Sequence, residues 1–352
     1  MEIPPPREPT SYEEMASRKL ILRRACSVES LFNSIRTTTN LSFSDKLRQL
    51  HQLHQAVGDP ENPEYEKFKG MAEEPERKIP VGEFRNRYMF LMDNFKMMPC
   101  FPLKTGTTNW QKALSSLNYV DENRVPHVAA DDIPQANVFK ELPRYHSRYN
   151  VHVFRKLRKE HPSNINNCIF EGLERRVNDD NYLKWINVRH PFSRAKERLF
   201  SAWHQKFDSN YEGFWSYKKY VPGIRTFEDE NSVEDTRYLV SFNAFLKYIV
   251  HVASDLDFNE HWQSYDWSCS PCSMNYHFVT KQESSAADAS FILRQRNLTD
   301  ITYLPGAYDD HTEASPKEIF NAHGISNEIA LQLYAIYYPD FIMYNYSIDE
   351  FL

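Results

Sequence analysis

This chain of 352 residues contains few glycines, no long apolar run and no excess of positive charge. With only 9 glycines, the sequence argues against a repetitive β-protein and against several independent glycine-rich phosphate loops. No stretch approaches the roughly 18 consecutive apolar residues that a membrane span needs. The formal net charge of −6 excludes a protein held to nucleic acid by bulk charge, although a local basic groove is compatible with it. We therefore expect no nucleic-acid partner.

The N-terminal segment also lacks a targeting signal. Residues 1–15 are rich in proline and acidic side chains and contain no apolar core of a signal peptide, which by itself predicts a cytosolic protein. The composition is that of an ordinary globular protein, with 41% hydrophobic and 26% charged residues. We expect a polar N-terminal extension or stem over residues 1–80 and one folded catalytic domain over residues 81–352.

Cysteine is sparse too, and the odd number of five leaves at least one thiol free, or paired between chains in an oxidising compartment. Cys269-Ser-Pro-Cys272 is the only Cys-x-x-Cys motif, and a structural zinc site normally needs a second such pair or two well-spaced histidines. We therefore favour a disulfide partner or simple burial for these cysteines over zinc, and expect no metal. Three glycosylation sequons, at Asn40, Asn297 and Asn345, lean weakly towards a secretory route.

Two strand–loop–helix units stand out against this background. An apolar run over residues 95–101 feeds into a loop with threonine and glycine, and residues 110–117 are compatible with a helix. A second buried-strand candidate spans residues 183–188, and Arg189-His-Pro191 opens a helix with proline in its first turn. Upstream, short apolar runs on either side of Asp93-Asn94 predict a hairpin or strand pair. The repeated unit predicts an α/β fold with a parallel sheet.

The first loop, Lys104-Thr-Gly-Thr-Thr-Asn109, has the composition of an anion cradle. Its glycine lets the backbone approach a ligand, and the amides of residues 106–109 would point at that ligand from the start of a helix. The later threonines add hydroxyl donors, and the lysine adds a mobile charge. In a nucleotide-hydrolysing P-loop the lysine follows the glycines, whereas here it precedes Gly106 by two positions. The alternative is a surface turn with an incidental lysine.

The second loop supplies another anion site. Arg189 stands at a strand end and serine follows on the helix, a combination that suits a phosphate monoester. Alone this signal is weak, because Arg-x-Pro opens many helices. Two phosphate sites at the carboxyl ends of two parallel strands, however, fit one ligand with phosphates at both ends. Such a ligand would lie across the strand ends of an open sheet.

Together the two loops resemble the donor-binding motifs of sulfotransferases that use 3′-phosphoadenylyl sulfate. The amino-acid sequence of the two motifs is most similar to that of the Golgi carbohydrate sulfotransferases. This group includes the chondroitin and dermatan 4-O-sulfotransferases and the killer-cell epitope sulfotransferase. The resemblance covers roughly residues 85–352, and residues 18–26 resemble the stem of that family. The downstream segments that carry it are Ser241 to Val250, His261-Trp262, Cys269-Ser-Pro-Cys272, Phe278 to Lys281 and Tyr337 to Ser347.

This resemblance implies a P-loop-like three-layer fold, with a central parallel sheet flanked by helices. It implies metal-free transfer of a sulfuryl group from 3′-phosphoadenylyl sulfate to a hydroxyl of a glycan, either a glycosaminoglycan or an N- or O-linked chain. Family members are type II membrane proteins, so we expect the Golgi lumen and a truncated N-terminus. The residues implied to bind the donor are Lys104, Thr105, Gly106, Thr107, Thr108 and Asn109 at the 5′-phosphosulfate, and Arg189 with Ser193 or Ser201 at the 3′-phosphate.

Sulfuryl transfer is an in-line displacement that needs charge stabilisation on the leaving phosphate and a base for the acceptor hydroxyl. Lys104 and the loop amides suit the first task. His152 is the candidate base, because it lies between the motifs, where family members carry a histidine followed by leucine five positions later, here Leu157. A surface histidine in a basic helix is the alternative. The adjoining basic cluster, which either grips an anionic polysaccharide or forms a solvated face, consists of Arg155, Lys156, Arg158 and Lys159.

Two departures from the family pattern bear on activity. Pro-Leu-Lys replaces the usual Pro-Lys, and Ser201 lies 12 residues after Arg189 where the family places a serine at eight. An inserted helical turn advances a helix by ~6 Å and rotates it by a net ~40°, which carries Ser201 out of reach unless a bulge absorbs it or Ser193 substitutes. The insertion motivates a rival function, a catalytically inactive glycan-binding relative. A kinase or NTPase is a further rival, disfavoured because no lysine follows Gly106 within the loop.

Overall fold

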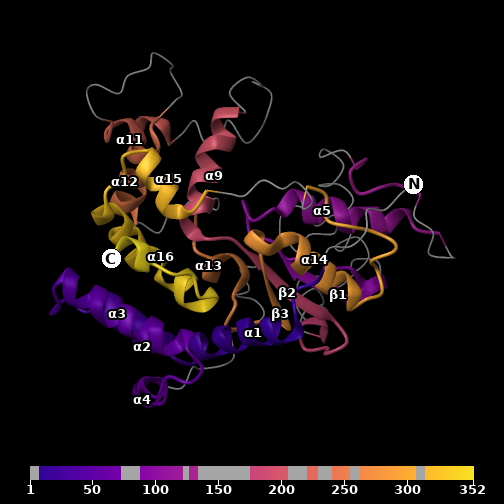
Figure 1. The fold of residues 1–352 in the computed structure, drawn as a ribbon, viewed down its shortest axis with the longest axis horizontal. Helices are drawn as coiled ribbons and strands as arrows, with labels where there is room; N and C mark the ends of the chain where they lie inside the picture. The colour runs from indigo at the N-terminus through magenta and orange to yellow at the C-terminus, as the bar shows by residue number, and fades with distance from the viewer. Residues whose placement is uncertain are drawn as a thin grey trace, which may run out of the picture. The chain divides into compact units, whose positions relative to one another are not determined.

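The computed structural model describes residues 8–72, 88–121, 127–133, 175–204, 220–228, 240–253, 262–306 and 314–352 (Figure 1). The chain divides into two compact units. The first unit comprises Met1–Glu29, Ala72–Arg189 and Tyr265–His311, and the second comprises Ser30–Met71, His190–Ser264 and Thr312–Leu352. Each unit combines segments that are distant in sequence. The domain boundary near residue 80 stays a prediction.

A three-stranded parallel sheet forms the centre of the first unit. Its strands are ordered β1 (Met97–Cys100), β2 (Leu183–Val188) and β3 (Phe278–Lys281), and both neighbouring pairs are parallel. β1 and β2 are buried along their whole length, as is usual in parallel sheets that are covered on both faces. The predicted α/β fold with a parallel sheet is confirmed, and the predicted strand over residues 183–188 has the bounds of β2.

One face of the sheet is covered by α5 (Thr107–Ser116) and α14 (Ser285–Arg294). Side chains alternate along a strand, so Leu183 and Trp185 share this face. Both belong to one hydrophobic cluster with residues of the two helices. The rings of Trp185 and Trp110 of α5 lie 5.6 Å apart between centroids. This packing holds α5 at the position where the predicted first loop ends.

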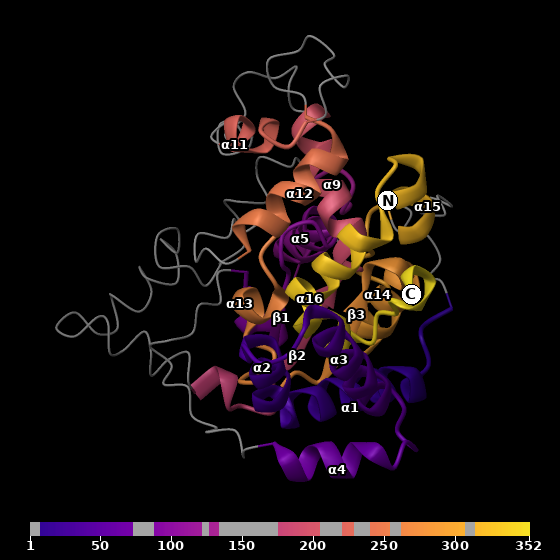
Figure 2. The same cartoon turned by 90° about the vertical axis from the view of Figure 1, so that its left-hand side faces the viewer.

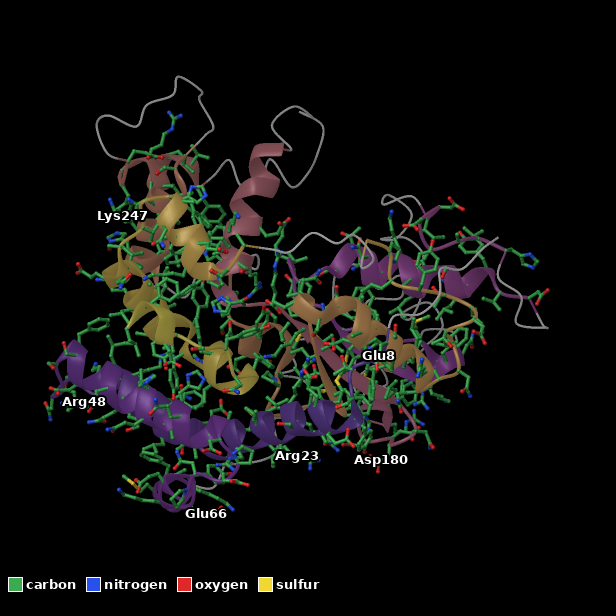
Figure 3. All side chains as sticks on the ribbon, in the orientation of Figure 1. Glu8, Arg23, Arg48, Glu66, Asp180 and Lys247 are labelled. Carbon is green, nitrogen blue, oxygen red and sulfur yellow. A yellow bond between two sulfur atoms is a disulfide. The ribbon has the colours of Figure 1, made fainter. Side chains whose placement is uncertain are left out.

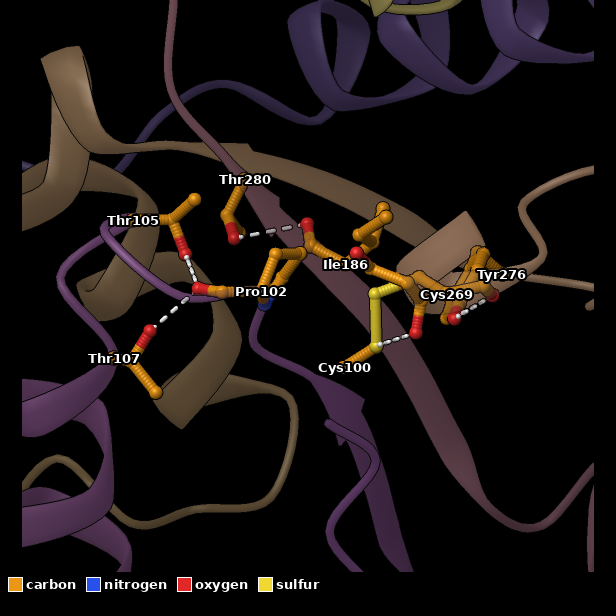
Figure 4. Close-up of a disulfide and its surroundings, with 9 residues drawn as sticks. Cys100, Pro102, Thr105, Thr107, Ile186, Cys269, Tyr276 and Thr280 are labelled. Carbon is orange, nitrogen blue, oxygen red and sulfur yellow. Dashed lines mark hydrogen bonds between the residues drawn. A yellow bond between two sulfur atoms is a disulfide. The ribbon is translucent and has the colours of Figure 1, made fainter. Parts of the chain in front are cut away.

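The opposite face of the sheet carries α13 (Tyr265–Cys269). Cys100, the last residue of β1, forms a disulfide with Cys269, and the Tyr276 hydroxyl donates to the Cys269 carbonyl at 2.8 Å (Figure 4). Helices therefore lie on both faces of the parallel sheet. This layering fits the three-layer P-loop-like fold that the resemblance implied.

The segment before β1 folds back along that strand, as predicted. Antiparallel bridges join Met89 to Cys100 and Met92 to Met97, and a 3-10 turn, Asp93–Phe95, closes the hairpin. The other 3-10 turns of the described residues are Leu117–Tyr119, Gln282–Ser284 and Asp349–Phe351.

The N-terminal helix of the first unit is α1 (Tyr12–Ser27), which packs against β3. The Arg18 guanidinium donates from Nη1 to Oδ2 of Asp288 at 2.6 Å, and that carboxylate is fully buried. A second disulfide joins Cys26 at the end of α1 to Cys272. An ion pair and a covalent bond thus attach the segment that resembles the family stem to the sheet-containing unit.

Both cysteines of the only Cys-x-x-Cys motif are therefore in disulfides, each with a different distant partner. The preference for a disulfide over zinc is confirmed at Cys269 and Cys272. Within the described ranges, no group of three or more histidine, cysteine or acidic side chains is arranged to hold a metal ion. Cys168 lies outside the described residues.

The second unit is helical. In it, α16 packs against α3 and α12 (Figure 2). The Tyr338 hydroxyl of α16 donates to the Leu50 carbonyl of α3 at 2.8 Å. Charged side chains such as Arg48 and Glu66 are exposed on its helices (Figure 3). None of the helices in the described part of the chain is long and apolar enough to cross a membrane. The helices are α2 (Glu29–Thr37, which begins in the first unit), α3 (Phe43–Gly58), α4 (Glu64–Met71), α9 (Pro191–His204), α11 (Val221–Arg225), α12 (Phe242–Val252), α15 (Pro316–Ala322) and α16 (Asn327–Tyr344).

Candidate active site

The loop between β1 and α5 makes a tight turn that uses two left-handed residues. Lys104 has φ 70° and Gly106 has φ 72°. Gly106 is the N-cap of α5, and its carbonyl accepts hydrogen bonds from the backbone N–H groups of Asn109 at 3.1 Å and Trp110 at 3.2 Å. The strand–loop–helix order predicted from the sequence is confirmed here. The loop brings the chain from the sheet directly to the N-terminus of a buried helix.

Backbone donors are available at this helix N-terminus. In the part of the chain that the structure describes, the N–H groups of Gly106, Thr107 and Thr108 form no hydrogen bond. The first N–H groups of a helix have no partner within the helix, and they carry the positive end of its dipole. Three such donors at a helix N-terminus can bind an anion, as the sequence predicted for this loop. Asn109, which was also predicted to present its amide, uses that N–H within the turn instead.

Two threonine hydroxyls of the loop form hydrogen bonds to a carbonyl of the same loop. Thr105 and Thr107 both donate from Oγ1 to the Pro102 carbonyl, at 2.8 Å and 2.6 Å (Figure 4). Thr107 therefore offers a ligand its backbone N–H rather than its hydroxyl hydrogen. Thr108 is only partly buried, and its hydroxyl makes no hydrogen bond to any residue that the structure describes. It is the hydroxyl donor in this loop that remains available.

The carboxyl end of β3 lies against the same loop. A Cβ added to Gly106 would lie 2.0 Å from Oε1 of Gln282 on a backbone with φ 72°, so a larger residue would displace that side chain and strain the turn. The neighbouring Lys281 is partly buried. Burial, and then the nearby Arg18 guanidinium, lower the pKa of Lys281 to about 8. At neutral pH this lysine therefore remains mostly charged and adds to the positive potential around the loop.

Arg189 follows directly after β2 and is held by its own backbone. The Tyr265 hydroxyl accepts from the Arg189 N–H at 3.0 Å and donates to the Arg189 carbonyl at 2.7 Å. The Arg189 side chain is largely buried, and its Nη1 donates to the Lys104 carbonyl at 3.4 Å. Arg189 and the first loop are therefore adjacent, and both belong to the first unit.

The two serines proposed for the 3′-phosphate both lie on α9, in the second unit. Ser193 is buried in the first turn of this helix. Ser201 belongs to the last turn, where the structure describes the backbone and not the side chain. The backbone of α9 is continuously helical from Pro191 to His204, so no bulge absorbs the inserted turn. The roles of both serines stay predictions.

The predicted base and the predicted acceptor-binding cluster lie outside the described residues. His152, Arg155, Lys156, Arg158 and Lys159 all belong to this part of the chain. Their assignments stay predictions.

Comparison with known proteins agrees with this geometry. A family model described as the sulfotransferase family matches residues 87–347, which include both loops and all three strands. The chain belongs to the sulfotransferase family. It is therefore a sulfotransferase enzyme, and the nucleotide-hydrolysing alternative is set aside.

Several curated relatives of this sulfotransferase are named carbohydrate sulfotransferases. Carbohydrate sulfotransferase 11 of Rattus norvegicus is 27% identical over 278 residues, which cover 76% of this chain and 69% of the relative. Carbohydrate sulfotransferases 12 and 10 of Mus musculus are each 27% identical over 290 residues, covering 77% of this chain and 62% and 70% of the relatives. No solved structure gives a significant match.

Four residues of this sulfotransferase that the sequence did not single out shape the site. Tyr265 bonds the backbone of Arg189, and Gln282 packs on Gly106. Asn187 donates to the Thr105 carbonyl of the loop, and Thr280 donates to Asn187. Asn187 and Thr280 carry a usable signal, because each is an uncharged polar residue that directly follows an apolar residue near the carboxyl end of a strand. Tyr265 and Gln282 carry none, since only the fold brings them to the loops.

Proposed function

We propose that this sulfotransferase transfers the sulfuryl group of 3′-phosphoadenylyl sulfate to a hydroxyl of a glycan. The observation that carries the proposal is the contact between the Arg189 guanidinium and the Lys104 carbonyl at 3.4 Å. It supports the proposal because the two candidate anion-binding segments lie side by side at the carboxyl ends of β1 and β2. The names of the carbohydrate sulfotransferase relatives support a glycan as the acceptor.

The chain's own groups fit such a donor. The 5′-phosphosulfate would lie at the N-terminus of α5, where three backbone N–H groups and the side chain of Lys104 supply positive charge. The 3′-phosphate would lie on Arg189, whose planar guanidinium suits a phosphate monoester. Ser193 is the candidate for an additional contact to that phosphate, because the continuous helix leaves Ser201 about two turns further along α9.

Sulfuryl transfer is a single displacement in which the protein stabilises the leaving group and accepts a proton. The acceptor oxygen attacks sulfur in line, the bond from sulfur to the bridging oxygen of the 5′-phosphate breaks, and adenosine 3′,5′-bisphosphate leaves. Lys104 and the loop amides stabilise the charge that builds on the leaving phosphate. His152 takes the proton of the acceptor hydroxyl as general base. The basic cluster at residues 155–159 holds an anionic acceptor, a glycosaminoglycan or an N- or O-linked chain.

The proposed compartment is the Golgi lumen, with the protein anchored as a type II membrane protein. Two disulfides support an oxidising compartment, because such bonds form and persist there and are rare in the cytosol.

The test is thermal melting with adenosine 3′,5′-bisphosphate and with adenosine 5′-monophosphate, followed by transfer of radiolabelled sulfuryl groups to a panel of desulfated glycosaminoglycans. A ligand that binds only the native state raises the melting temperature. We expect the bisphosphate to give the larger shift, and Lys104→Ala to reduce the shift and abolish transfer. Glycan binding without transfer in the parent protein, unchanged in Lys104→Ala, would instead support an inactive glycan-binding relative.

A further inference from the structure

We propose that Asn187 and Thr280 form a positioning pair that orients the backbone of the anion loop for the donor. The inference rests on the proposed function, since it assigns these residues a task in binding the 5′ end of that donor. Neither residue needs to touch the ligand. Both act through the peptide group between Thr105 and Gly106.

The pair is built into the sheet. Asn187 of β2 and Thr280 of β3 are direct partners in the parallel ladder, and both side chains are completely buried. Burying an amide and a hydroxyl inside a sheet is unfavourable unless each is hydrogen-bonded. Here the bonds are made: Nδ2 of Asn187 donates to the Thr105 carbonyl, and Thr280 Oγ1 lies 2.7 Å from Oδ1 of Asn187.

The direction of the Asn187 amide follows from its partners. The Thr105 carbonyl can only accept, so the NH2 group of Asn187 must face it. The amide oxygen then faces Thr280, whose hydroxyl must donate to it. Thr280 Oγ1 also lies 3.2 Å from the Ile186 carbonyl, the longer of its two contacts (Figure 4). The hydroxyl of Thr280 thus stabilises the orientation of the Asn187 amide in which the NH2 group bonds the Thr105 carbonyl.

The hydrogen bond from Asn187 to the Thr105 carbonyl determines the direction of the next backbone N–H group, that of Gly106. In a trans peptide the C=O of one residue and the N–H of the next point in opposite directions. With the Thr105 carbonyl directed into the sheet at Asn187, the Gly106 N–H is directed away from the sheet. That N–H is one of the three loop amides with no hydrogen bond among the described residues. Arg189 acts in the same way on the preceding peptide, since its guanidinium holds the Lys104 carbonyl.

An external anchor is needed because the loop itself does not fix this peptide. Gly106 has φ 72°, and glycine populates both signs of φ with similar ease. The peptide before a glycine can therefore rotate at little cost. The Thr105 and Thr107 hydroxyls brace the Pro102 carbonyl, which lies earlier in the loop, so they do not hold the Thr105 carbonyl. Asn187 supplies the missing restraint.

The experiment compares Asn187→Asp, Thr280→Val and Thr280→Ser with the parent protein, using calorimetric titration. Adenosine 3′,5′-bisphosphate and adenosine 5′-monophosphate probe the loop, and adenosine 3′-monophosphate probes Arg189 alone. Thr302→Val is the matched control, because Thr302 is a buried threonine of the same unit that donates to the Ala113 carbonyl at 2.9 Å, away from the loop.

We expect Asn187→Asp and Thr280→Val to raise the Kd of the two 5′-phosphate ligands about tenfold, the usual effect of losing one buried hydrogen bond. The Kd of adenosine 3′-monophosphate should stay within about twofold. Thr280→Ser keeps the hydroxyl and should bind the nucleotides as tightly as the parent protein does. Thr302→Val should lower the melting temperature without changing the Kd of any of the three nucleotides. If Asn187→Asp does not fold because it buries a charge, the two Thr280 variants decide the question.

Three results would overturn the inference, and they can be told apart. If the parent protein binds the bisphosphate and Thr280→Val binds it equally well, the positioning role is wrong while the proposed function stands. Equal weakening of the 5′ and 3′ monophosphates would likewise indicate a general structural role. If the parent protein binds none of the three nucleotides, the proposed function fails and the inference fails with it.

Discussion

Arg189 illustrates how single residues set this site. Its position depends less on its own side chain than on Tyr265, whose hydroxyl bonds both the N–H and the C=O of its backbone. Tyr265 is completely buried and belongs to α13, which the Cys100–Cys269 disulfide attaches to β1. Tyr265 thus holds the backbone from which the guanidinium extends.

Tyr265→Phe is expected to weaken binding of adenosine 3′-monophosphate by about tenfold, because the Arg189 backbone loses both hydrogen bonds in a buried place. Binding of adenosine 5′-monophosphate should change little. Tyr276→Phe is the matched control, since its hydroxyl is also buried and donates to the Cys269 carbonyl at 2.8 Å. Titration of both nucleotides against both variants checks this, and equal effects of the two substitutions would contradict it.

At the scale of elements, the turn from β1 into α5 is the decisive feature. The turn reverses through left-handed residues at Lys104 and Gly106, and the second of these also packs against Gln282. A non-glycine residue with positive φ is uncommon and is destabilised relative to an ordinary conformation. The surroundings of Lys104 therefore stabilise an uncommon backbone conformation two residues before the N-cap of α5.

Gly106→Ala is expected to lower the melting temperature and to abolish bisphosphate binding. The added Cβ meets Oε1 of Gln282, and it also destabilises the left-handed backbone by about 1–2 kcal/mol. Gly324→Ala separates these effects, because Gly324 has φ +62° and nothing within 4 Å of the added Cβ. Thermal melting should show the larger loss for Gly106→Ala. If the melting temperature falls no further for Gly106→Ala than for Gly324→Ala, the Gln282 side chain moves aside without destabilising the protein.

For the whole molecule, covalent bonds join segments that the sequence places far apart. The disulfides Cys26–Cys272 and Cys100–Cys269 span 246 and 169 residues, and both lie in the first unit. A disulfide restricts the unfolded chain, and more so when the closed loop is long. The first unit therefore depends on folding under oxidising conditions.

Removing the second disulfide by Cys100→Ala with Cys269→Ala is expected to lower the free energy of unfolding by about 2–5 kcal/mol. Reduction of the parent protein should lower its melting temperature in the same direction. Mass analysis of non-reduced peptides should recover both disulfide-linked pairs. Cys168→Ala is the control, because Cys168 takes no part in either described disulfide. A melting temperature that is insensitive to reductant would contradict this account.

The sequence by itself determined the elements and the chemistry of the loops. Apolar runs that end in Lys104-Thr-Gly and in Arg189-His-Pro predicted two strands, two turns and two helices, because hydrophobic periodicity and turn chemistry are local properties. The resemblance to sulfotransferases rested on the same local motifs, and the family match bears it out. The disulfide preference at Cys269 and Cys272 was likewise confirmed, although the partners could not be read from spacing.

Tertiary structure alone decided which residues hold those loops in place. Strand register brings Asn187 beside Thr280, and a disulfide brings α13 and Tyr265 to Arg189. These contacts join positions about 75 to 95 residues apart, so no local pattern encodes them. The orientation of a backbone amide depends on what its carbonyl meets across the sheet. The sequence therefore determined the candidate anion-binding groups, and the fold determined their orientation.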